Sequence, residues 1–223
     1  AKSRTIEILC VQHQGNPTVR ILDDGHGLTE DELCSAMRPA STNPDDERAA
    51  DDLGRFGWGM KSASLSQCRH LTVITRKNGT YSGASWDLDD VADWRMGVLE
   101  PDEIKDLANP KLLEHDGTEI IWNKCDRLSE FGKVKTRDFN ELVAHAKSSL
   151  ALTFHRFLAG ENGLQKLQII FNGDSLKAYD PFLRNHPATQ SKPIEHLELE
   201  QKPFSVQAFI LPHYSKLSSH EHE

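Results

Sequence analysis

Residues 53–64 read LGRFGWGMKSAS, a stretch in which three glycines precede a lysine and a serine. Glycine has no side chain, so the backbone at Gly54, Gly57 and Gly59 can approach another group closely. A helix that begins near Gly59 would point its free N–H groups at an anion, and Lys61 would add a positive charge there. The stretch therefore predicts a phosphate-binding loop. Its spacing departs from G-x-x-x-x-G-K-[ST], which excludes a Walker A loop.

A second glycine motif lies earlier in the chain, in the stretch ILDDGHGLTEDEL at residues 21–33. A strand ends just before Asp23, and Gly25 and Gly27 follow it. A carboxylate at this place can accept a hydrogen bond from the exocyclic amine of adenine, whereas guanine presents an acceptor there and would be repelled. The motif predicts an adenine-binding turn, and on this motif alone an ordinary Asp-Gly turn is an equally good interpretation. Asp24 is expected to face away.

Hydrophobic periodicity predicts an α/β protein in which helices cover a mixed, largely antiparallel sheet. Strands are expected at residues 5–11, 18–22, 117–122, 167–176 and 204–212, the last two in a second unit. Asn78-Gly79 suits a type I′ turn and predicts a hairpin over residues 70–88. Thr29 and Glu32 match a capping box, which predicts the start of a helix there. Further helices are expected at residues 60–68, 101–108 and, as one long amphipathic helix, 137–158, and a loop at residues 38–52.

The composition is that of an ordinary soluble protein, with 223 residues, 37% hydrophobic content and a formal net charge of −8. That length suffices for one large domain or one domain and part of another. No apolar run approaches the ~20 residues that span a membrane, and no signal peptide opens the chain, so we expect a cytoplasmic protein without a membrane partner. The four cysteines include no CxxC pair and are expected to be reduced, mostly buried thiols. The basic cluster of Lys133, Lys135 and Arg137 is interpreted as a solvated linker rather than a nucleic-acid contact.

The stretches DDGHG, GRFGWGMKSAS and HDGTEIIW, taken together, resemble the GHKL ATPases, which share the Bergerat nucleotide-binding fold. That superfamily includes type II topoisomerases, mismatch-repair MutL, heat-shock chaperones, histidine kinases and MORC proteins. The glycine, lysine and serine spacing is most similar to MORC proteins and their bacterial relatives. The resemblance implies a GHKL ATP-binding domain at residues 1–128. It also implies a linker helix and an incomplete S5-like transducer domain at residues 129–223.

The resemblance assigns a role to each motif residue. Asp23 would read the adenine N6, Gly27 would let the base approach, and Leu28 and Met37 would form an apolar wall. Residues 38–58 would be a lid over the nucleotide, and Thr118 would bond the base directly or through water. Backbone amides near Gly57, Gly59 and Met60, with Lys61 and Ser62, would hold the phosphates. The predicted ATP-binding residues are Asp23, Gly25, Gly27, Leu28, Met37, Gly54, Phe56, Gly57, Trp58, Gly59, Met60, Lys61, Ser62 and Thr118.

Catalysis in this superfamily implies Mg²⁺, a general-base Glu and a metal-binding Asn on one helix, and we expect that helix before Ala1. Glu119 and Asn123 have the right spacing, but on a strand they lie ~13 Å apart and cannot share one metal–phosphate site. No catalytic residue and no metal ligand are therefore expected in residues 1–223. The chain as given is expected not to hydrolyse ATP, although a longer protein would.

The function implied is the head of an ATP-driven clamp that forms a homodimer when ATP binds. The bacterial MORC-like relatives suggest DNA-related work or defence, with DNA or DNA-processing proteins as partners. Two alternatives stay open: a nucleotide-regulated binding module that does not hydrolyse ATP, and a topoisomerase- or MutL-type ATPase head. A histidine kinase domain fits less well, because a long helix and further strands follow the sheet.

Overall fold

A computed structural model describes residues 2–38, 57–90, 96–128, 134–200 and 202–219 of the protein. Most of the predicted lid, together with Gly54 and Phe56, lies outside these residues. The longer strands are β1 (Thr5–His13), β2 (Asn16–Asp23), β3 (His70–Lys77), β4 (Thr80–Asp87), β6 (Gly117–Asn123), β7 (Gln168–Phe171), β10 (Glu195–Leu199) and β11 (Lys202–Val206). Four two-residue strands complete the set: β5 (Gly97–Val98), β8 (Asp174–Ser175), β9 (Gln190–Ser191) and β12 (Phe209–Ile210). The α-helices are α1 (Glu30–Met37), α2 (Gly59–Leu65), α3 (Pro101–Leu107), α4 (Pro110–Glu114), α5 (Thr136–Thr153) and α6 (His155–Ala159). Three short 3₁₀ helices are η1 (Asp126–Leu128), η2 (Glu161–Gly163) and η3 (Tyr214–Lys216).

The centre of the molecule is a sheet of eight strands in the order β5-β4-β3-β6-β2-β1-β7-β8. Its pairs are antiparallel except for β1 and β7, which run parallel. The predicted hairpin is confirmed: Asn78 and Gly79 have φ values of 52° and 79°, and a type I′ turn requires positive φ at both positions. The capping box is confirmed as well, since Thr29 and Glu32 each bond the other's backbone N–H. The predicted fold class, helices over a mixed and largely antiparallel sheet, is therefore confirmed.

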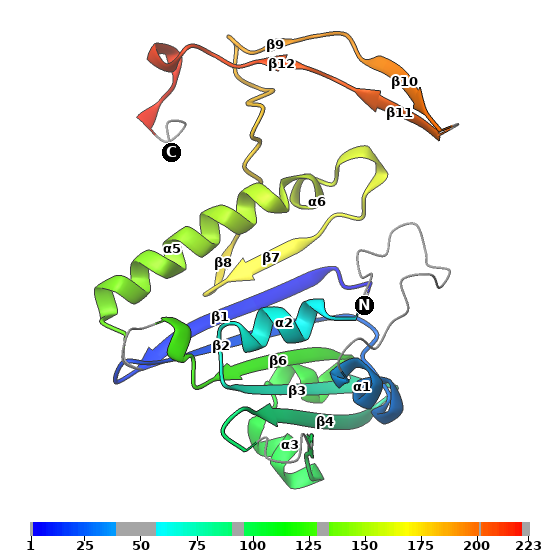
Figure 1. The fold of residues 1–223 in the computed structure, drawn as a ribbon, viewed down its shortest axis with the longest axis vertical. Helices are drawn as coiled ribbons and strands as arrows, with labels where there is room; N and C mark the ends of the chain where they lie inside the picture. Colours follow the sequence, from blue (N-terminus) through cyan, green and yellow to red (C-terminus); the bar gives the residue numbers. More distant parts are fainter. Residues whose placement is uncertain (1, 39–56, 91–95, 129–133, 201, 220–223) are drawn as a thin grey trace.

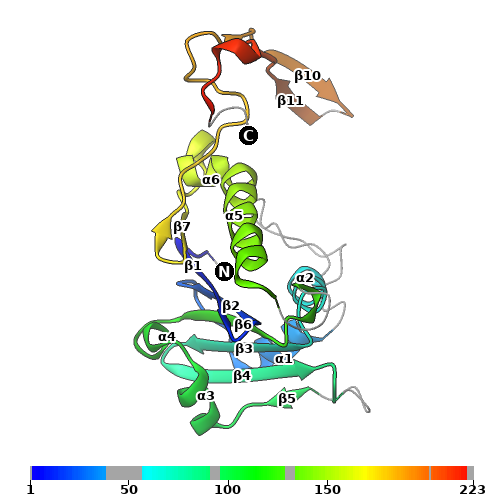
Figure 2. The same cartoon turned by 90° about the vertical axis from the view of Figure 1, so that its left-hand side faces the viewer.

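Helices cover both faces of this sheet (Figure 2). Side chains along a strand alternate between the two faces, and the apolar ones on each face are buried beneath helices. On the face of α1 and α2 the buried cluster consists of Leu33, Met37, Cys68, Leu71, Val73, Ala84 and Cys125. On the face of α3 and α4 it consists of Leu22, Ile74, Ile104, Ala108, Leu112 and Ile121. The neighbours Val73 and Ile74 of β3 thus belong to opposite cores.

A partly buried ion pair fixes α3 and α4 against the sheet. Glu119 of β6 is 0% exposed, and its Oε1 accepts a hydrogen bond of 2.8 Å from Arg20 Nε of β2. Its Oε2 accepts one of 2.7 Å from the backbone N–H of Asn109, between the two helices. Arg20 Nη2 also donates to the carbonyl of Leu107. Glu119 therefore has a structural role on the α3 and α4 face.

Two expectations for the second half of the chain were wrong. The segment 167–176 does not start a separate sheet: β7 pairs with β1, with Thr5 opposite Gln168, and so extends the central sheet. The single long helix is interrupted at Phe154, whose φ and ψ of −98° and 15° end α5 before α6 begins. The interruption redirects the chain so that the Leu158 side chain is buried.

The last part of the described chain stands apart from the sheet, above α5 and α6 (Figure 1). It contains the antiparallel pairs β10–β11 and β9–β12, and every residue of β10 and β11 is exposed. Within the described ranges no helix is long and apolar enough to cross a membrane. All four cysteines are free thiols, and Cys68 and Cys125 are buried.

Candidate functional site

A row of polar residues crosses three neighbouring strands on the face that α1 and α2 cover. Asp23 of β2 is the cross-strand partner of Thr118 of β6, and Thr118 is the partner of Thr75 of β3. Directly paired residues of adjacent strands project to the same face of a sheet. Two of the predicted site residues, which are far apart in the sequence, therefore lie side by side.

Asp23 occupies the end of β2, where the chain turns away from the sheet. Its Oδ1 accepts a hydrogen bond of 2.8 Å from the backbone N–H of Gly25. Burial raises the pKa of the Asp23 carboxyl, and the Gly25 hydrogen bond partly opposes that shift. The carboxylate is thus half-buried, held in place and able to accept a further hydrogen bond.

Asp24 has a different role, and its side chain turns toward the start of β1. Its Oδ1 accepts hydrogen bonds of 2.8, 2.7 and 2.8 Å from Ser3 Oγ, Arg4 N and Thr5 N. Asp24 therefore ties two strand ends together.

Two glycines allow the strand ends at this site to approach. Gly27 has a φ of +64°, and a Cβ added there would lie 1.8 Å from the carbonyl oxygen of Arg76. A Cβ added to Gly117 would lie 2.2 Å from the carbonyl oxygen of Asp23. Packing against β3 is thus a sufficient reason for glycine at position 27, and the approach of a base is not needed to explain it. Sequence reasoning placed Gly117 on a strand but did not see this contact.

Thr75 completes the site, and the sequence analysis did not find it. The residue is 0% exposed, and its Oγ1 accepts a hydrogen bond of 2.8 Å from the backbone N–H of Leu28. The same hydroxyl donates to the carbonyl of Gly117 at 2.9 Å and lies 3.2 Å from Thr118 Oγ1. The only sequence signal was a polar residue at the apolar face of the strand 70–77.

The predicted apolar wall belongs largely to the core beneath the site. Leu28 is partly buried and packs against the α1 and α2 cluster, whereas Met37 is 0% exposed within it. Trp86 Nε1 donates to the carbonyl of Met37 at 3.3 Å, which fixes the end of α1 to β4.

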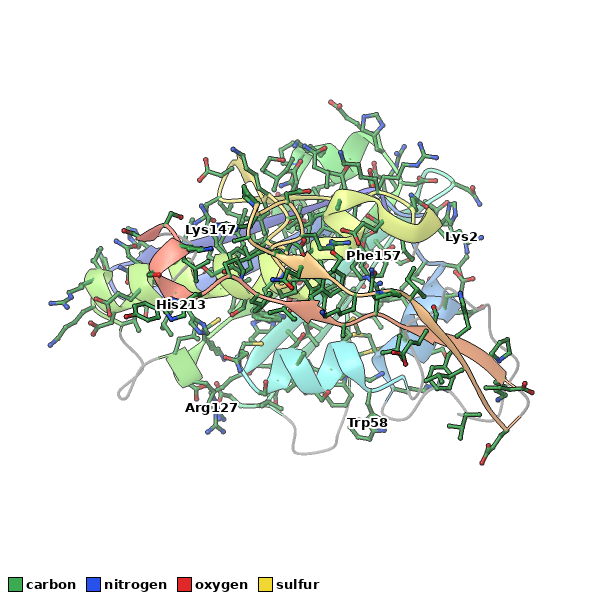
Figure 3. The ribbon with its side chains drawn as sticks, turned by 90° about the horizontal axis from the view of Figure 1, so that it is seen from above. Lys2, Trp58, Arg127, Lys147, Phe157 and His213 are labelled. Carbon is green, nitrogen blue, oxygen red and sulfur yellow. The ribbon has the colours of Figure 1, made fainter. Side chains whose placement is uncertain are left out.

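The glycine and lysine stretch enters the described structure at Gly57, whose φ is +61°. Trp58 is 47% exposed and projects outward from the start of α2 (Figure 3). Among the described residues, no atom lies within 4 Å of a Cβ added to Gly59, so packing against that part of the chain does not require glycine there. Met60 packs against the core.

Lys61 and Ser62 both bond the protein backbone in this structure. Lys61 is 5% exposed, its Nζ donates to the carbonyl of Ala36 at the end of α1, and burial lowers its pKa. Ser62 Oγ donates to the carbonyl of Trp58 at 2.9 Å. The structure thus brings Asp23, Gly25, Gly27, Leu28 and Thr118 together, and it turns the polar ends of Lys61 and Ser62 toward the backbone.

A cavity of about 190 Å³ lies between α4 and the ends of β1 and β2, on the opposite face of the sheet. Of the predicted site residues it includes Asp23 alone, and it is smaller than the ~300–1,000 Å³ typical of ligand pockets. Among the residues that the structure describes, no three His, Cys, Asp or Glu side chains are grouped to hold a metal ion.

Comparison with known proteins gives one family match and several similar structures. A family model described as histidine kinase-, DNA gyrase B-, and HSP90-like ATPase matches residues 1–118. The ATPase and transducer domains of DNA topoisomerase II from Balamuthia mandrillaris align with a TM-score of 0.54 and 18% identity, over 89% of this chain and 51% of that one. The ATPase region of Saccharomyces cerevisiae topoisomerase II gives a TM-score of 0.54 and 14% identity, over 87% and 50%.

The same yeast region bound to ICRF-187 aligns with a TM-score of 0.52 and 13% identity, over 88% of this chain and 53% of that one. At such identities the similarity shows a shared fold. The chain spans about half the length of these structures. No curated protein is significantly similar to the chain.

Proposed function

This chain belongs to the histidine kinase-, DNA gyrase B- and HSP90-like ATPase family, the GHKL ATPases, and on that premise we propose that Asp23 and Thr118 bind the adenine of ATP. The observation that carries the proposal is their cross-strand pairing, which sets a carboxylate beside a hydroxyl on one face of the sheet. The exocyclic amine of adenine donates two hydrogen bonds and matches such acceptors. Gly25, Gly27 and Leu28 form the adjoining turn, and Met37 supports it from below.

The phosphates would bind at the start of α2. We assign their contacts to backbone amides of Gly57, Trp58, Gly59 and Met60 and to the side chains of Lys61 and Ser62, with Gly54 and Phe56 in the preceding stretch. This assignment is supported by Gly59, since no atom of the described residues lies within 4 Å of a Cβ added there. Lys61 would exchange its hydrogen bond to Ala36 for one to a phosphate oxygen.

Mg²⁺ would neutralise phosphate charge when bound. In nucleotide sites this ion keeps several waters and takes one or two carboxylates plus phosphate oxygens, so a cage of protein ligands is not required. The described residues supply no such cage, and the role assigned here to each residue does not depend on the ion.

We propose that this chain is the head of an ATP-driven clamp that forms a homodimer and serves DNA-related work or defence, as in MORC-like ATPases. The residue spacing of the glycine and lysine stretch supports the MORC-like assignment. A topoisomerase- or MutL-type head is the alternative favoured by the topoisomerase II structures to which the fold is similar. We also propose that residues 1–128 form the ATP-binding domain and that residues 129–223 form a linker helix and an incomplete S5-like transducer, whose strand β7 joins the central sheet.

The test of the site is calorimetric titration of ATP into the protein and into Asp23→Asn. The variant should lose ~1.5–3 kcal/mol of binding free energy, the range for a hydrogen bond to a charged group. Asp106→Asn is the matched control, because Asp106 is exposed on α3 and should leave ATP affinity unchanged. A folded Asp23→Asn variant with unchanged ATP affinity would rule out the assigned role of Asp23.

A turnover assay distinguishes an ATPase from a binding module that does not hydrolyse ATP. Release of inorganic phosphate from ATP and ATP affinity are both measured in a protein that extends beyond residues 1–223, because residues 1–223 alone are expected not to hydrolyse ATP. Tight ATP binding with no turnover would favour the regulated binding module over the ATPase.

A further inference from the structure

Thr75 lies where β3, β6 and the turn before α1 meet in the candidate site. Its hydroxyl contacts the Leu28 N–H from the turn, the Gly117 carbonyl from β6 and the Thr118 hydroxyl, at 2.8, 2.9 and 3.2 Å. Thr75 is fully buried, so water does not replace any of these partners. Nothing in the family match or the proposed ATP contacts gives Thr75 a role.

The hydrogen atoms in this network can be assigned from chemistry. A threonine hydroxyl has one hydrogen to donate and two lone pairs to accept with. The Gly117 carbonyl can only accept, so the Thr75 hydrogen points to it. The Leu28 N–H can only donate, so it occupies one lone pair of Thr75. The contact with Thr118 is therefore made through the second lone pair, and Thr118 must be the donor.

This assignment determines what Thr118 can offer to a ligand. Its single hydrogen is committed to Thr75, so only lone pairs remain on Thr118 Oγ1. Rotating the hydroxyl of Thr75 to relieve this would break its hydrogen bond to the buried Gly117 carbonyl, and losing a buried hydrogen bond is costly. Asp23, the neighbour of Thr118 in the row, is also an acceptor when ionised.

We propose that Thr75 is a positioning residue that fixes the Thr118 hydroxyl as a hydrogen-bond acceptor and thereby makes the site select purine nucleotides with an amino group at C6. The inference rests on the proposed function, namely that Asp23 and Thr118 bind the base. An amino group at C6 donates two hydrogens and satisfies two acceptors. A carbonyl at C6, as in guanine or hypoxanthine, places a third acceptor against them, directly or across a bridging water.

The test compares ATP with inosine triphosphate, which replaces the C6 amino group by a carbonyl. Calorimetric titration should show the unmodified protein binding ATP at least about tenfold more tightly than inosine triphosphate, the effect of one mismatched hydrogen bond. Thr75→Val keeps the side-chain volume but removes the hydroxyl, which frees Thr118 to donate. The ATP preference should then fall by about tenfold. Thr75→Ser keeps the hydroxyl and should keep the preference.

A second variant covers the case in which Thr75→Val does not fold. Thr118→Val removes the hydroxyl that Thr75 positions, and it should lower the ATP preference as far as Thr75→Val does, with no further fall in the double variant. An unchanged preference in folded Thr75→Val or in Thr118→Val would overturn the inference while leaving ATP binding itself intact. Failure of the unmodified protein to bind ATP would instead overturn the proposed function and this inference with it.

Discussion

Gly27 is the residue at which backbone conformation and packing both restrict the side chain. Its φ of +64° strains any L side chain, and a Cβ there would overlap the Arg76 carbonyl. Gly27→Ala should lower the free energy of unfolding by roughly 3 kcal/mol, because left-handed strain of about 1–2 kcal/mol adds to overpacking of about 1–3 kcal/mol. Urea denaturation measures the loss.

Gly163→Ala is the matched control for that substitution. Gly163 has a φ of +76°, and no atom of the described residues lies within 4 Å of an added Cβ, so the loss of stability in Gly163→Ala should come from strain alone, about 1–2 kcal/mol. Equal losses in the two variants would contradict the close contact with β3.

Asp24 should make the stability of the protein depend on pH in the acid range. Burial acts to raise its pKa, but hydrogen bonds from Thr5, Ser3 and Arg4 outweigh burial and lower the pKa below the ordinary 3.8. The folded state thus binds the proton more weakly than the unfolded state. The resulting stability is fully present above pH values near 3.8 and is lost as the pH falls through the lower, folded pKa.

The corresponding measurement is the unfolding free energy of Asp24→Asn and of the unmodified protein between pH 7 and pH 3. The variant should be less stable at pH 7, and the difference should shrink as the pH falls. Asp106→Asn, exposed on α3, is the control and should show little difference at any pH. A deficit of Asp24→Asn that grows on acidification would contradict the lowered pKa.

Among the elements, those defined by local chemistry were predictable from sequence and those defined by distant contacts were not. The Asn78-Gly79 turn and the Thr29 and Glu32 capping box each depend on a few consecutive residues. The pairing of β7 with β1 joins segments that no local pattern connects. At the site, Asp23 was predicted from its motif and Thr118 from the resemblance, but Thr75 was not, because its contacts arise only when β3, β6 and the turn meet.

The partly buried pair of Arg20 and Glu119 is the element-scale contact whose loss should cost most. Glu119→Gln removes the charge that faces Arg20 while keeping the shape of the side chain. The variant should lose ~1.5–3 kcal/mol of stability, because the hydrogen bonds involve ionised groups in a buried place. Glu141→Gln, in the exposed pair with Arg137 on α5, should cost less than ~0.5 kcal/mol in the same denaturation experiment. Similar costs for both would mean that burial adds nothing to the inner pair.

At the scale of the whole molecule, the central sheet crosses the boundary expected at residue 128. β7 adds four residue pairs to β1, and beyond them Asn172 continues the connection. Asn172 Oδ1 accepts from the backbone N–H of Cys10 at 2.7 Å, and its Nδ2 donates to the Cys10 carbonyl at 3.1 Å. The residues before and after the boundary therefore share backbone hydrogen bonds, which should make them unfold together.

Two spectroscopic probes weight the two halves of the chain differently. All four tryptophans, at positions 58, 86, 94 and 122, precede residue 128, so fluorescence reports that half, whereas described helices lie on both sides of residue 128, so circular dichroism reports both halves. Urea unfolding followed by tryptophan fluorescence and by far-ultraviolet circular dichroism should give coincident transitions if the sheet is one cooperative unit. Asn172→Gly keeps the positive φ of 48° accessible but removes the two contacts to Cys10. Both transitions should therefore move together to lower urea concentrations, and the free energy of unfolding should fall by about 1–2 kcal/mol. Asn185→Ala, at an exposed position, should move neither. Transitions that separate in the unmodified protein, or a shift in the dichroism alone, would show instead that the chain unfolds as two independent domains on either side of residue 128.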